Sequence, residues 1–102
     1  MLTYELERKE TTMRVRLSGR IDNEGAAVFG SALDRAFLAN PQRAALDLSQ
    51  VAFINSAGIG KLLSFYKRMR NRDAEIRIEG INDDVFTMFK AIRLDKLIPI
   101  EK

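Results

Sequence analysis

The chain has 102 residues, 17 of them basic and 14 acidic, and contains neither cysteine nor histidine. Disulfide bonds and thiolate chemistry are therefore excluded, and the commonest general base and metal ligand are absent. The length predicts a single domain over residues 1–102, and a net charge of +3 does not by itself indicate nucleic-acid binding. The sequence shows neither a signal peptide nor an apolar run long enough to span a bilayer, so we expect a cytoplasmic protein without a membrane partner.

Two strands are expected at the start of the chain. Residues 4–9 alternate weakly between polar and apolar and predict an edge strand. Residues 13–19 alternate clearly, and Gly19 is expected to end that strand. The residues that should point into the core are Met13, Val15 and Leu17.

A first helix is expected from about Glu24 to about Ala39. Its start signal is the pair Asp22-Asn23, because either side chain can accept a hydrogen bond from a free backbone N–H group. Pro41 stops the helix, since the residue before a proline is disfavoured in the α region. The apolar residues that recur on one face of this helix are Phe29, Leu33, Ala36 and Phe37.

The middle of the chain predicts a buried strand at residues 43–48 and a second helix from about residue 57 to about residue 71. The expected inward face of this helix consists of Ile59, Leu62, Leu63, Tyr66 and Met69. The opposite face collects the basic residues Lys61, Lys67, Arg68, Arg70 and Arg72. A nucleic-acid site on residues 61–72 is an alternative, but aromatic residues are not interleaved there, and we interpret the basic side chains as a solvated face.

The last third predicts a strand at residues 75–79, closed by Gly80, and a third helix capped within residues 82–84. The expected apolar face of this helix consists of Val85, Met88, Phe89 and Ile92. Phe86 lies off that face and is a candidate contact residue. Residues 94–97 predict a final turn, and residues 98–100 an extended segment at a sheet edge.

Strands that alternate with helices predict an α/β fold. We expect a mixed sheet of four to five strands, mostly parallel with an antiparallel edge hairpin, and three to four helices.

The stretch from Phe53 to Gly60 is the candidate functional segment. Ser56 is expected at a helix N-terminus, where serine commonly acts as a plain cap and where a phosphate would also be tolerated. A catalytic role is excluded, because the chain has no histidine base and no Gly-x-Ser-x-Gly elbow. Gly58 and Gly60 lack the remainder of a phosphate-binding loop and are expected to allow close packing. The pair Asp83 and Asp84 is interpreted as a helix cap.

These segments together resemble the STAS domain, and within it the stand-alone anti-sigma factor antagonists of bacteria. The resemblance covers nearly the whole chain. Its most specific part is Asn55-Ser56-Ala57-Gly58-Ile59-Gly60, which is similar to the family motif Asp-Ser-(Ser/Thr/Ala)-Gly-hydrophobic-Gly. Residues 19–22 resemble the family's Gly-x-hydrophobic-Asp segment, and residues 89–97 are similar to its closing helix.

The resemblance implies a switch without catalytic residues, metal or cofactor. In the family, a serine kinase that is also an anti-sigma factor binds the antagonist and phosphorylates the motif serine, here Ser56; a PP2C-type phosphatase reverses the step. The implied partner-binding residues are Asp22, Asn23, Asn55, Ser56, Ala57, Gly58, Ile59, Gly60 and Lys61. Asn55 departs from the family's aspartate, which would slow phosphorylation if that carboxylate assists it. STAS modules of biofilm or lipid-transport pathways are the alternative implied by the same resemblance.

Overall fold

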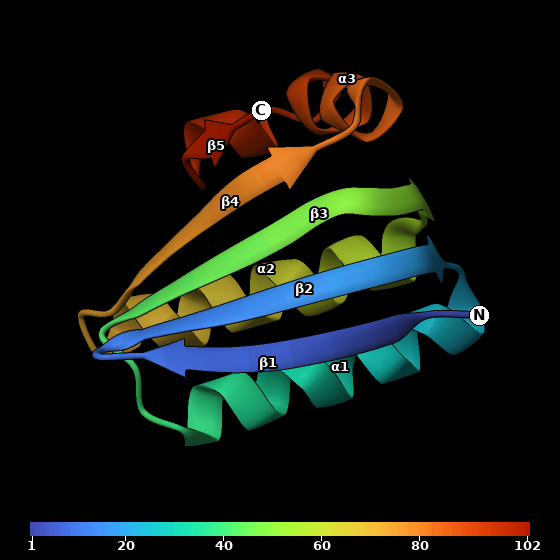
Figure 1. The fold of residues 1–102 in the computed structure, drawn as a ribbon. Helices are drawn as coiled ribbons and strands as arrows, with labels where there is room; N and C mark the ends of the chain where they lie inside the picture. The colour runs from blue at the N-terminus through green and yellow to red at the C-terminus, as the bar shows by residue number, and fades with distance from the viewer.

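The computed structural model describes all 102 residues and contains a single five-stranded mixed sheet (Figure 1). The strands β1 (Thr3–Lys9), β2 (Thr12–Ile21), β3 (Arg43–Ile54), β4 (Glu75–Ile81) and β5 (Ile100–Glu101) lie across the sheet in chain order. The β1–β2 pair is antiparallel and the other pairs are parallel. The predicted α/β fold with an antiparallel edge hairpin is therefore confirmed.

The helices are α1 (Asn23–Leu38), α2 (Ser56–Asn71) and α3 (Asp83–Ala91), followed by a short 3-10 helix, η1 (Leu94–Lys96). The connection between two parallel strands is right-handed. When each new strand lies on the same side of the previous one, the connecting helices therefore lie on one face of the sheet. Figure 1 shows α1 and α2 along that face of the sheet. The opposite face of β1, β2 and β3 has no helix over it. No helix in the structure combines the length and apolarity needed to cross a bilayer.

The core lies between the sheet and the helices, and most of its predicted members are confirmed. Met13, Val15 and Leu17 of β2 are buried, as are Phe29, Leu33 and Ala36 of α1. The side chain of Phe37 is only partly buried at the margin of the core.

The predicted inward face of α2 is confirmed for Leu62 and Met69 but missed Phe65. Phe65 is 1% exposed and joins Leu62 and Met69 in the core, whereas Ile59, Leu63 and Tyr66 are only partly buried. In the third helix, Ile92 is 50% exposed and lies outside the core in which it was expected. Phe86 is half-buried, with the ammonium groups of Lys90 and Lys102 over its ring.

Three strands extend further than predicted. Gly19 and Gly80 lie inside β2 and β4 with φ angles of 120° and 107°, instead of ending these strands. A Cβ atom on Gly19 would lie 2.0 Å from the carbonyl oxygen of Met1, so the position requires both the backbone freedom and the missing side chain of glycine. β3 continues past Leu48 to Ile54; its register with β4 shifts between Leu46 and Leu48, and its register with β2 shifts at two places.

Candidate functional site

The N-termini of the three α-helices lie at the carboxyl ends of parallel strands, where sites in α/β proteins are commonly found. Each helix is capped by a side chain in the residue that precedes it. Oδ1 of Asp22 accepts from the Gly25 N–H group at 2.9 Å, and Oδ1 of Asn55 accepts from the Gly58 N–H group at 3.0 Å. Asn82 caps α3, so the cap predicted within residues 82–84 is confirmed, but Asp83 and Asp84 lie in the first turn and are not the cap.

Ser56 is the first residue of α2, and its side chain is exposed. Its hydroxyl group takes part in no hydrogen bond within the chain. The interpretation of Ser56 as a plain helix cap is wrong, because the amide of Asn55 occupies that role. The hydroxyl is therefore free and accessible at a helix end that favours negative charge.

Asn55 uses both halves of its side chain. While Oδ1 caps α2, Nδ2 donates to Oδ1 of Asn23 at 2.8 Å, and the backbone N–H of Asn55 donates to the carbonyl of Ile21 at 2.9 Å. An aspartate in this position would keep the cap but would have no N–H to donate. The asparagine thus fixes the segment before Ser56 against the start of α1, and it places Asn23 beside Asn55.

Gly58 and Gly60 have different surroundings. A Cβ atom on Gly58 would lie 2.4 Å from Cγ2 of Ile21 and 2.8 Å from Cγ1 of Ile54, whereas a Cβ atom on Gly60 would have nothing within 4 Å. The predicted close packing is confirmed for Gly58 and is wrong for Gly60. Gly60 is an exposed helical glycine that no internal contact requires.

Alanine substitutions at these two glycines form a matched pair. We expect Gly58→Ala to lower the free energy of unfolding by about 1–3 kcal/mol, because the added methyl group overpacks the contact with Ile21 and Ile54. Gly60→Ala should raise the free energy of unfolding by about 0.5–1 kcal/mol through helix propensity alone. Urea denaturation measures both values; a Gly58→Ala protein as stable as the wild type would show that the two isoleucines move aside.

The basic face of α2 is not uniformly solvated. The guanidinium of Arg68 pairs with Asp34 at 2.7 Å and lies 4.2 Å from the ring centroid of Phe37. Arg72 stacks on the same ring at 3.7 Å and donates to the Phe37 carbonyl. These two arginines join α2 to α1, so the interpretation of the whole row as a solvated face is wrong for them. Lys61 is exposed and lies over Gly30 of α1.

Asp22 is the residue of this site whose pKa departs from its usual value. The hydrogen bond from the Gly25 N–H group lowers the pKa of Asp22 below its usual value of 3.8, and the charge of Arg20 contributes. Folding therefore favours the ionised form. The resulting stabilisation is present above about pH 3.8 and is lost as the pH falls through the lowered pKa.

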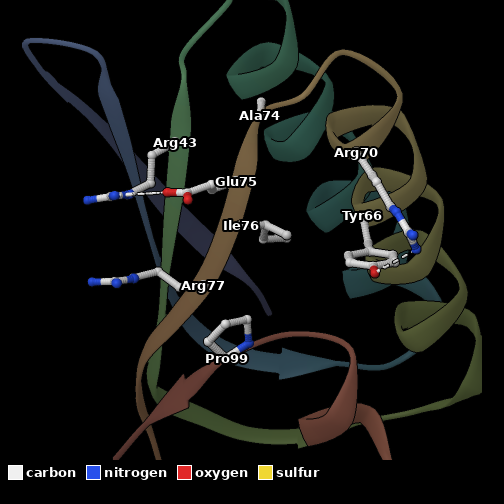
Figure 2. Close-up of a pocket in the computed structure, with 8 residues that line it drawn as sticks. All are labelled: Arg43, Tyr66, Arg70, Ala74, Glu75, Ile76, Arg77 and Pro99. Carbon is white, nitrogen blue, oxygen red and sulfur yellow. Dashed lines mark hydrogen bonds and ion pairs between the residues drawn. The ribbon is translucent and has the colours of Figure 1, made fainter.

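A pocket of about 270 Å³ lies away from Ser56, between the C-terminal half of α2 and β4 (Figure 2). Nη1 of Arg70 donates to the Tyr66 hydroxyl at 3.3 Å on one side, and Ile76 lies on the other. Figure 2 shows the Arg43–Glu75 pair directed away from Tyr66, across β4. None of the predicted site residues lines this pocket. The structure contains no group of three or more acidic side chains placed to hold a metal ion.

Arg20 and Phe53 also lie near the carboxyl ends of β2 and β3, and sequence reasoning did not identify them as site residues. They are register partners on these neighbouring strands, and the guanidinium carbon of Arg20 lies 4.6 Å from the ring centroid of Phe53. Their contact depends on a strand register with two irregularities, so no local pattern in the sequence indicates it.

The comparisons with known proteins agree with this geometry. The family model described as "Mlab, STAS domain" matches residues 4–99. An anti-sigma F factor antagonist of Paenibacillus polymyxa is 27% identical over 100 residues, which are 97% of this chain and 86% of that protein. An anti-sigma-B factor antagonist of Listeria monocytogenes is 25% identical over 101 residues, which are 98% of this chain and 89% of that protein.

Two solved structures share the fold. An anti-sigma factor antagonist from Mycobacterium paratuberculosis matches with a TM-score of 0.88 and 23% identity, covering 98% of this chain and 85% of that one. The Bacillus cell fate determinant SpoIIAA in its phosphorylated form matches with a TM-score of 0.75 and 16% identity, covering 98% of this chain and 92% of that one. At these identities the structures establish the fold alone.

Proposed function

Because this chain belongs to the STAS domain family, we propose that it is an anti-sigma factor antagonist, controlled by phosphorylation of Ser56. Its partner is a serine kinase that also acts as an anti-sigma factor, and a PP2C-type phosphatase removes the phosphate. The protein acts in the cytoplasm as a binding module and not as an enzyme. The names of the Paenibacillus and Listeria relatives support this assignment.

The observation that carries the proposal is the free hydroxyl of Ser56. It is free because Asn55, and not Ser56, caps α2. A phosphate there adds about −1.5 to −2 charges at the first turn of α2. Negative charge at a helix N-terminus is favourable, so the fold tolerates the modification. The effect of phosphorylation therefore falls on the docked partner, through new charge and bulk.

The proposed docking surface surrounds Ser56. Asn23, Ala57, Gly60 and Lys61 are exposed there, whereas Gly58 is buried and supports the surface from below. The glycine at position 60 lowers the free energy of unfolding by about 0.5–1 kcal/mol relative to alanine, and no internal contact requires it. A partner that approaches the backbone of α2 closely accounts for this cost.

Intact-mass measurement on the protein purified from its own cells tests the proposal. We expect one phosphate in a fraction of the wild-type molecules and none in the Ser56→Ala variant. Peptide mapping then places the phosphate. A phosphate on another residue, or no phosphate in either growing or starved cells, would contradict the proposal. Capture of a biofilm or lipid-transport component in place of a kinase would favour the alternative STAS pathways.

A further inference from the structure

The face of the sheet opposite α1 and α2 carries five arginines, and one of them differs from the others. Arg14, Arg16, Arg43 and Arg77 each form at least one ion pair with a carboxylate of the same sheet. Arg20 forms no ion pair and no side-chain hydrogen bond, although its side chain is exposed. Its neighbour Asp22 is already engaged as the cap of α1.

The orientation of Arg20 follows from strand alternation. Ile21 and Ile54 are buried on the side of α2, where both would touch a Cβ atom on Gly58. Successive side chains of a strand point to opposite faces, so Arg20 and Phe53 point to the face without helices. Phe53 is half-buried there beside the guanidinium of Arg20.

Stacking on Phe53 leaves the donor groups of Arg20 available. A guanidinium over an aromatic ring is held by a cation–π interaction, while the N–H groups at its edge remain free for a planar acceptor. A carboxylate fits that edge with two parallel hydrogen bonds. Arginine and aromatic residues are also enriched among the residues that dominate binding energy at protein interfaces.

We propose that Arg20 and Phe53 anchor an acidic side chain of the protein partner that docks at Ser56. This inference rests on the proposed function, because it assigns the chemistry of that same partner. The partner's carboxylate forms a bidentate pair with Arg20, and the apolar atoms beside it cover Phe53. A carboxylate-bearing partner surface also supplies the repulsion by which a phosphate on Ser56 separates the complex.

The Ser56→Ala variant is first used to capture a partner from the protein's own cells. This partner is identified by mass spectrometry and then purified. Isothermal titration calorimetry compares the wild type, Arg20→Ala and the control Arg43→Ala. Arg43 lies on the same face at the opposite end of β3, paired with Glu75. We expect Arg20→Ala to raise the Kd about tenfold or more and Arg43→Ala to change it less than about twofold. Arg20→Lys should give an intermediate Kd, because it keeps the charge but loses the planar fork.

The outcomes separate this inference from the proposed function. If the purified partner binds the wild type and Arg20→Ala equally, the acidic anchor is wrong and the Ser56 switch stands. If no variant retains a partner, both proposals are wrong. Thermal unfolding of Arg20→Ala, which should match that of the wild type, shows whether a loss of binding reflects a loss of fold.

Discussion

Replacing Phe65 by alanine is expected to lower the free energy of unfolding by about 3–5 kcal/mol. The ring is 1% exposed and belongs to the central cluster between α2 and the sheet. Its removal deletes buried contacts and leaves a cavity that Leu62 and Met69, fixed on the same helix, fill only in part. Urea unfolding followed by circular dichroism measures the loss.

Tyr66 is the control for this prediction, since it is the next residue of α2 and is also aromatic. Its ring is only partly buried, and its hydroxyl is held by Arg70 at 3.3 Å on the surface. Tyr66→Ala should therefore cost only about 1–2 kcal/mol. A Phe65→Ala protein that loses no more stability than Tyr66→Ala would contradict the observed orientation of the helix.

The sequence predicted the orientation of α2 only in part, because its large apolar residues form two adjacent rows along the helix. Ile59, Leu63 and Tyr66 have helical spacing, and so do Leu62, Phe65 and Met69. The second set faces the sheet because Gly58, four residues before Leu62, must pack on Ile21 and Ile54. A glycine adds nothing to an apolar pattern. The pattern of hydrophobic residues therefore does not reveal the contact of Gly58 with Ile21 and Ile54, which sets the orientation of the helix.

Other parts of the fold and site were predictable for local reasons. β2 is buried on one side only, so Met13, Val15 and Leu17 alternate with polar residues, and Asp22 marks the start of α1 by its capping chemistry. The strand ends were missed at Gly19 and Gly80, because glycine usually marks the end of a strand and here permits a positive φ within one. The segment around Ser56 was placed correctly, but the choice between Asn55 and Ser56 as cap required the structure.

Replacing Ser56 by aspartate is expected to have the largest effect on partner binding. The aspartate places a negative charge where the proposed phosphate would stand, opposite the partner. The Kd should rise at least about tenfold, which corresponds to about 1.4 kcal/mol. The free energy of unfolding should change by no more than about 0.5 kcal/mol, because the position is exposed and a helix N-terminus favours an anion. Calorimetry with the purified partner and urea denaturation measure the two quantities.

Ser56→Asn separates charge from size, because asparagine has nearly the shape of aspartate and no charge. If repulsion drives release, Ser56→Asn should bind nearly as well as Ser56→Ala. The difference in Kd between the aspartate and asparagine variants should also shrink at high salt, since exposed charges are screened within about 10 Å at 0.1 M ionic strength. Equal binding by Ser56→Asp and Ser56→Ala would rule out the charge switch, whereas equal weakening by aspartate and asparagine would assign release to bulk at the first turn of α2.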